Sequence, residues 1–94
     1  MEDLLAVFLR AREALSQPGN DFSWSSWRDA DEALHEIDGF IAQLRAGGAP
    51  DELQMRVLFA PTGPMQEVSL SSGWGQAFLD LARDFDSALA RARG

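Results

Sequence analysis

The sequence predicts an α+β fold, with the element order α-α-β-β-α and three helices packed on one face of an antiparallel β-hairpin. Apolar residues recur every three or four positions in three segments of the 94-residue chain, which is the spacing of one helix face. Between the second and third segments, apolar and polar residues alternate on both sides of a turn, as in a hairpin. The composition, 46% hydrophobic and 24% charged, is that of a folded chain, and we expect residues 1–94 to form a single domain.

The first helix is expected over residues 4–16. Its apolar stripe consists of Leu4, Val7, Phe8, Ala11, Ala14 and Leu15. Pro18 and Gly19 end this helix, because both residue types favour turns and proline does not continue a helix. Residues 17–26 are rich in turn-forming residues and are expected to be a loop.

The second helix is expected over residues 27–46. Ser26 and Asp29 resemble a shortened capping box at its start, and Gly47 with Gly48 supplies its C-terminal cap. Its apolar stripe consists of Trp27, Ala30, Leu34, Ile37, Ile41 and Leu44.

The hairpin is expected to have strands at residues 54–60 and 65–70, joined by the turn Pro61-Thr62-Gly63-Pro64. Pairing Ala60 with Met65 places nearly all the apolar side chains of both strands on one face, as a half-buried hairpin requires. A last helix is expected over residues 74–92. Its apolar stripe consists of Trp74, Phe78, Leu81, Phe85, Leu89 and Ala92.

The hairpin also bears on the oligomeric state. Two strands alone leave both sheet edges unpaired, and such edges favour association with another chain. Pairing the hairpins of two chains would give a four-stranded sheet, so the sequence predicts a homodimer through the hairpin edge. Pro61 and Pro64 partly protect the edges, which leaves a monomer open.

Missing residue types restrict the chemistry. The chain has no Lys, Tyr or Cys, and a single His, and this bias together with abundant Ala and Gly is typical of GC-rich codons and a bacterial source. Thiol catalysis, zinc–thiolate sites, Schiff bases and the Walker-type lysine are therefore excluded. The remaining inventory is His35, carboxylates, hydroxyls and Arg, which favours a role without catalysis and predicts no cofactor.

Charge and hydropathy exclude further classes. The net charge is −7, and the Arg residues are scattered among 15 acids without a basic stripe, which argues against nucleic-acid binding. No apolar run approaches the roughly 18 residues that span a bilayer. Acids follow Met1 where a secretory signal carries positive charge, so we expect a cytoplasmic protein that does not bind membranes.

His35 is the candidate for metal or acid–base chemistry. On a helix, Asp31 lies four residues before it and Asp38 three residues after it, so all three share a face. Such a set could hold a divalent metal with open positions. The interpretation we favour is a solvated face on which His35 pairs with its acidic neighbours.

Acids in the first half of the same helix are the candidates for partner binding. Asp31, Glu32 and Glu36 could form a face that docks a basic protein. Complementation of the helix dipole and solubility explain the same residues without a partner.

Two aromatic residues in the loop, Phe22 and Trp24, lie outside every apolar stripe. A large aromatic in a loop either folds back over the core as a lid or marks a binding surface. For a chain this short of core material we favour the lid, and we keep the binding surface as the alternative.

Ser72, Gly73 and Trp74 form a second candidate ligand site, in the turn that ends at Gly75. The start of a helix offers free N–H groups to an anion. Neither a dinucleotide fingerprint nor a P-loop is present here, and capping of the helix by Ser72 is the simpler explanation.

The stretch from Leu58 to Glu67, together with Gly73-Trp74-Gly75, Phe78 and Phe85-Asp86, is similar to segments of small bacterial proteins of unknown function. The resemblance covers about a third of the chain. It implies no activity, cofactor or catalytic residue.

The sequence therefore predicts a small acidic bacterial protein-interaction module, of the kind represented by immunity proteins and antitoxins. One alternative is a small-molecule or anion-binding domain that uses the Trp24 loop or the Gly73–Gly75 turn. Another is a metal-dependent enzyme built on His35.

Overall fold

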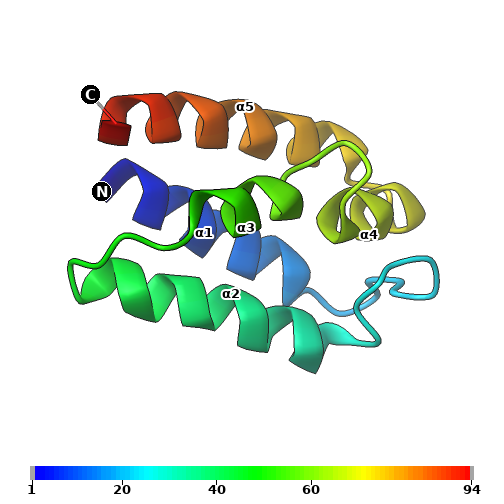
Figure 1. Cartoon of the computed structure of the whole chain (residues 1–94). Coiled ribbons are helices and arrows are strands. Elements are labelled where there is room, and N and C mark those ends of the chain that lie inside the picture. Colours follow the sequence, from blue (N-terminus) through cyan, green and yellow to red (C-terminus); the bar gives the residue numbers. More distant parts are fainter. Residues whose placement is uncertain (1, 94) are drawn as a thin grey trace.

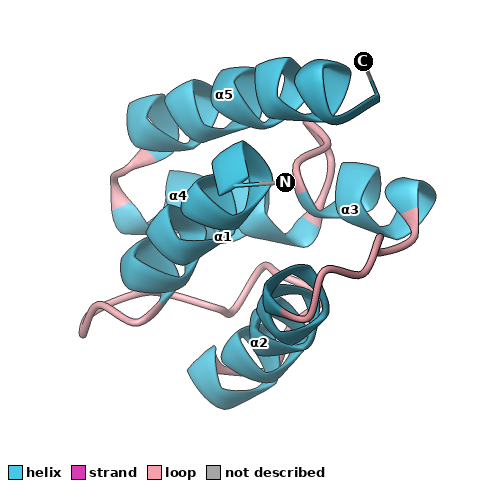
Figure 2. Ribbon diagram, turned by 90° about the vertical axis from the view of Figure 1, so that its left-hand side faces the viewer, coloured by secondary structure: helices cyan, strands magenta, loops and turns pink. Residues whose placement is uncertain are grey.

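The computed structural model describes residues 2–93, and over these residues the regular structure is entirely helical. The helices are α1 (Glu2–Leu15), α2 (Ala30–Arg45), α3 (Glu52–Leu58), α4 (Pro64–Ser72) and α5 (Gly75–Arg93). α1 lies between α2 and α5, and α4 lies at one end of this group (Figures 1 and 2). The predicted α+β fold is wrong, because the described chain contains a bundle of helices and no strand.

The first predicted strand, residues 54–60, lies mostly in α3. Met55 and Leu58 are buried, as is Phe59 directly after the helix, and this is the i, i+3, i+4 spacing of a helix face. Val57, which the alternation placed on the buried face, is 51% exposed. The Asp51 side chain accepts a hydrogen bond from Gln54 N at 3.0 Å and so caps the start of the helix.

The second predicted strand, residues 65–70, lies in α4. Pro64 occupies the first turn, where its missing N–H costs nothing. Met65, Val68 and Ser69 are buried, whereas Leu70 is 66% exposed. Without a strand edge in the described chain, the predicted homodimer through the hairpin loses its physical basis.

The C-terminal end predicted for the second helix is correct, but its predicted start is too early. α2 begins at Ala30, three residues later than expected, because Asp29 accepts a hydrogen bond from Glu32 N at 2.9 Å. At the other end, Gly47 N donates to Leu44 O and Gly48 N donates to Gln43 O, the paired bonds of a Schellman ending. Gly47 has φ of 81°, which only glycine adopts without strain.

The core is organised around Phe8 of α1. Its ring lies 5.4 Å from that of Phe40, 5.6 Å from that of Phe59 and 6.4 Å from that of Phe85. Phe59 and Phe85 stack at 4.3 Å with an interplanar angle of 11°. This cluster joins α1, α2 and α5 to Phe59, directly after the end of α3.

Ion pairs fix α1 to its neighbours at the surface. Arg10 pairs with Asp84 of α5 at 2.8 Å, and Arg12 pairs with Asp38 of α2 at 2.6 Å. Both pairs are partly exposed, so each contributes little free energy and mainly favours one alignment of the helices. No helix in the described part of the chain combines the length and apolar character needed to cross a membrane.

Candidate functional site

The loop between α1 and α2 carries Phe22 and Trp24, the two aromatic residues among the predicted partner-binding residues, and its start is fixed by Asn20. The Asn20 side-chain amide donates to Ala14 O at 2.8 Å and to Leu15 O at 3.2 Å, so it satisfies carbonyl groups at the end of α1. Its Oδ1 accepts from Trp74 Nε1 at 2.8 Å. One side chain therefore joins the end of α1 to the turn between α4 and α5.

Asp21 continues the attachment to α4. Its backbone N–H donates to Ser72 Oγ at 2.8 Å, and its Oδ1 accepts from Ser23 N at 2.9 Å. Hydrogen bonds from the side chain and the backbone of Ser23 lower the pKa of the Asp21 carboxyl below its ordinary value. The loop therefore holds a carboxylate that stays ionised at neutral pH.

Ser25 fixes the second half of the loop. Ser25 N donates to Phe22 O at 3.1 Å, which closes a turn over residues 22–25. Ser25 Oγ donates to Pro64 O at 3.0 Å and accepts from Trp27 N at 3.2 Å. The loop thus runs alongside α4 and is bonded to it at both ends of the turn (Figure 1).

Trp27 anchors the loop to α2. Its indole is buried, and its Nε1 donates to Glu36 Oε2 at 2.6 Å. The predicted role of Trp27 as a core residue is confirmed, although it precedes the helix instead of beginning it.

Trp24 lies inside the turn over residues 22–25 and is 75% exposed. Phe22 is half-buried and packs against the core. The favoured interpretation of Trp24 as a lid over the core is wrong, since Phe22 turns inward and Trp24 faces solvent. The hydrogen bonds that fix the loop leave its largest apolar side chain in water.

The acids proposed as one docking face lie on different sides of α2. Consecutive helix positions are about 100° apart, so Asp31 and Glu32 point in different directions, and Glu36 lies still further from Asp31. Glu32 is bonded to Arg28 Nε at 2.8 Å, and Glu36 holds the Trp27 indole. Asp31 is exposed, and it remains a candidate for partner contact.

His35 lies on the exposed side of α2 with Asp31 and Asp38, as the spacing predicted. Asp38 is bonded to Arg12 through both of its carboxylate oxygens, at 2.6 and 3.4 Å. Among residues 2–93, no three His, Asp or Glu side chains lie close enough together to hold a metal ion. The structure therefore gives no support to a metal site at His35.

The residues of the second candidate ligand site bond to the loop. Ser72 Oγ accepts from Asp21 N, and Trp74 Nε1 donates to Asn20. Gly73 has φ of 83° and ends α4, with Trp74 N donating to Ser69 O at 2.9 Å. The Ser72 hydroxyl, which was expected to cap the last helix, and the Trp74 indole instead hold the loop against the end of α4.

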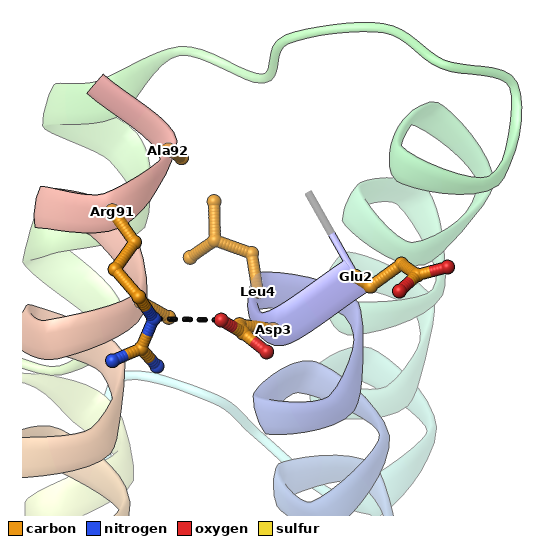
Figure 3. Close-up of a pocket in the computed structure, with 6 residues that line it drawn as sticks. Glu2, Asp3, Leu4, Arg91 and Ala92 are labelled. Atoms are coloured by element: carbon orange, nitrogen blue, oxygen red, sulfur yellow. Dashed lines mark hydrogen bonds and ion pairs between the residues drawn. The ribbon is translucent and has the colours of Figure 1, made fainter. Parts of the chain in front are cut away.

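The hollows in the described surface are open. One of about 350 Å³ lies where the first turn of α1 meets the last turns of α5, beside the 2.7 Å ion pair between Asp3 and Arg91 (Figure 3). Its lining residues are Glu2, Asp3, Leu4, Ala88, Arg91 and Ala92. Another of about 500 Å³ lies between α1 and α2 and includes the Arg12–Asp38 pair. Neither brings together a nucleophile and a base.

Sequence reasoning missed Asn20 and Ser25, the two residues that organise the loop. Both stand in a run of turn-forming residues, where Asn and Ser side chains commonly bond to nearby backbone groups. That signal could have singled them out, but it could not have identified Trp74 or Pro64 as their distant partners.

Comparisons with known proteins add no further assignment: no family model matches the chain, and neither the curated proteins nor the solved structures give a significant match.

Proposed function

We propose that this chain is a protein-interaction module that docks a basic partner protein through Trp24. The observation that carries the proposal is the 75% exposure of this indole on a turn that is itself held by hydrogen bonds. An exposed tryptophan on a fixed backbone buries a large area in a complex and loses little conformational entropy on binding.

The charge of the chain supports a basic partner. The net charge of −7 accelerates the approach of a positively charged protein. Asp21, whose pKa is lowered, accepts a hydrogen bond from the backbone of Ser23, so a negative charge lies against the turn that carries Trp24. An Arg or Lys of the partner can then stack on the indole face and interact with a carboxylate nearby.

The module would act by binding alone, as immunity proteins and antitoxins do, and a cytoplasmic location is part of the same proposal. The chain needs no cofactor for this role. The alternatives based on His35 and on the Gly73–Gly75 turn receive no comparable support, since Asp38, Ser72 and Trp74 already bond within the chain.

The test compares three full-length baits: the unaltered chain, Trp24→Ser, and Leu53→Ser as a control. Leu53 is 70% exposed on α3, so its replacement removes a similar kind of exposed apolar side chain elsewhere. Partners enriched from an extract of the native host by the unaltered chain and by Leu53→Ser should be lost with Trp24→Ser. For a purified partner, Trp24→Ser should weaken affinity at least about 30-fold, the loss expected for a central anchor residue.

Charge reversal at Asp31 tests the acidic contribution separately. Asp31→Arg should slow association with the partner and reduce the dependence of the association rate on salt. Glu36 is not used for this test, because its reversal would also break the hydrogen bond to Trp27 and could alter the fold. Equal affinity of one purified partner for the unaltered chain and for Trp24→Ser would show that the proposed docking site is wrong.

A further inference from the structure

Arg45 differs from the other arginines of residues 2–92 in having no acidic partner. The others all form ion pairs with Asp or Glu, namely Arg10, Arg12, Arg28, Arg56, Arg83 and Arg91. Arg45 forms neither an ion pair nor a side-chain hydrogen bond within the described chain, although the sequence contains 15 acids. Its guanidinium group is therefore available to an anion from outside the chain.

Capping of α2 does not account for Arg45. A basic side chain in the last turn of a helix often bonds to the final carbonyl groups. Here the carbonyls of Ala42, Gln43 and Leu44 already accept hydrogen bonds from backbone N–H groups that follow the helix. The helix dipole favours a cation at this end, but it holds the side chain in no particular bond.

Arg45 borders a hollow of about 500 Å³ between α1 and α2. This volume lies within the range of sites that bind small organic molecules. The lining residues of α2 are spaced by three or four positions and so share one face: Asp38, Ile41, Ala42 and Arg45. α1 contributes Leu9 and Arg12, which are three positions apart. The hollow is therefore built from one face of each helix.

The lining combines apolar surface with one unbalanced positive charge. Ile41 is buried, and Leu9 is 38% exposed. Arg12 is bonded to Asp38 through Nε and Nη2, at 2.6 and 3.4 Å, so these two charges offset each other and Arg45 leaves one positive charge in excess. The complement of this lining is an apolar group with a single negative charge. A phosphate group carries nearly two negative charges at neutral pH and is a poorer match beside Asp38.

We propose that this hollow binds a small linear monocarboxylate with an apolar tail. The carboxylate pairs with Arg45, whose planar guanidinium group can donate two parallel hydrogen bonds to it. The tail lies along Leu9, Ile41 and Ala42. Because the Trp24 loop precedes α2 and Arg45 ends it, this inference does not depend on the docking function proposed above.

Titration of the unaltered, full-length chain with the carboxylates from acetate to octanoate, followed by NMR, tests the site. The signals of Leu9, Ile41 and Ala42 should shift to saturation with octanoate, and affinity should rise about two- to fourfold for each added CH₂. Hexanol has the tail of hexanoate without its charge and should bind at least about tenfold more weakly than hexanoate. Shifts that fail to saturate by about 10 mM octanoate, or an affinity independent of tail length, would overturn the proposal.

Two arginine variants test the position of the carboxylate. Arg45→Gln should weaken octanoate binding at least about tenfold, because it removes the charge that pairs with the ligand. Arg28→Gln is the matched control: it changes the net charge equally, at an exposed side chain before the other end of α2, and should bind octanoate as the unaltered chain does. An equal loss in both variants would show an effect of net charge alone. Unchanged affinity in Arg45→Gln would also contradict the site.

Two further substitutions test the tail and the competing carboxylate. Leu9→Ser should reduce the gain in affinity from hexanoate to octanoate, since it removes apolar lining. Asp38→Asn should strengthen octanoate binding, because it removes a negative charge and frees Arg12; the pair is partly exposed, so its loss leaves the fold intact. The opposite result for either variant would contradict the assignment. Trp24→Ser should leave octanoate binding unchanged, which keeps this test separate from that of partner docking.

Discussion

Trp74 Nε1 donates a hydrogen bond to Asn20 Oδ1 at 2.8 Å, joining two residues that are 54 positions apart in the sequence. The amide of the same Asn20 bonds to Ala14 O and Leu15 O, the carbonyl groups at the end of α1. The loop that presents Trp24 is therefore attached at its base to two different parts of the bundle.

We expect Asn20→Ala to lower the free energy of unfolding by about 1–3 kcal/mol, because it leaves a half-buried indole N–H and helix-end carbonyls without their partner. Urea unfolding followed by circular dichroism measures this change. In a double-mutant cycle with Trp74→Phe, the two substitutions should be non-additive by about 1 kcal/mol. Strict additivity would mean that the Asn20–Trp74 bond contributes nothing to stability.

Acid should weaken the alignment of α1 with α5. The hydrogen bond from Arg10 lowers the pKa of Asp84 below its ordinary value. A carboxyl whose pKa is lowered by folding stabilises the folded state above its unfolded pKa of about 3.9. That contribution is lost as the pH falls from about 4 through the lower folded value.

The variant Asp84→Asn checks this pH dependence. Its urea midpoint should fall less between pH 7 and pH 2.5 than that of the unaltered chain. Glu13→Gln serves as the matched control, because it removes one carboxylate from an exposed position of α1. An identical fall for the unaltered chain and Asp84→Asn would contradict a role for Asp84 in acid stability.

Position 63 requires glycine because no side chain fits there, although its backbone angles would suit other residues. Its φ is −84°, but an added Cβ would collide with Val57 O and lie 3.2 Å from Ala60 O. Neither oxygen can move without disturbing the turn between α3 and α4. Gly63→Ala should therefore lower the free energy of unfolding by about 2 kcal/mol or more. A thermal or urea midpoint equal to that of the unaltered chain would refute this close approach.

Gly39 provides the matched comparison for Gly63, since alanine fits at this position. It lies in the interior of α2, where an added Cβ meets nothing within 4 Å. Gly39→Ala should raise the free energy of unfolding by about 0.5–1 kcal/mol, because alanine loses less backbone entropy in a helix. The same unfolding experiment measures it, and a loss of stability would show that α2 is not regular at this position.

The three long helices could be predicted from sequence because each repeats its apolar spacing over several turns. Leu4, Phe8 and Leu15 in α1, and Phe78 and Phe85 in α5, are buried as their spacing indicated. The candidate site was predicted less completely. Sequence reasoning selected Trp24 and Phe22, but it assigned Trp24 the wrong environment and did not identify Asn20 as the residue that fixes the loop.

The sequence alone could not show that α3 and α4 are helices and not strands. In the segment 54–60, Met55, Val57 and Phe59 match a strand, while Met55, Leu58 and Phe59 match a helix. Over so few residues both periods fit, and local propensity is too weak to choose between them. Contact of Phe59 with Phe8 and Phe85 selects the helix, and that contact exists only in the folded bundle.

The sequence by itself determined the long amphipathic helices, the glycine ending of α2, the acidic surface and the narrow chemical inventory, because these follow from local spacing and composition. The tertiary structure alone decided that α3 and α4 are helices, that Asp38 of α2 bonds to Arg12 of α1, and that Trp24 faces solvent. Each of these depends on contacts between residues far apart in the chain, and such contacts leave no local pattern.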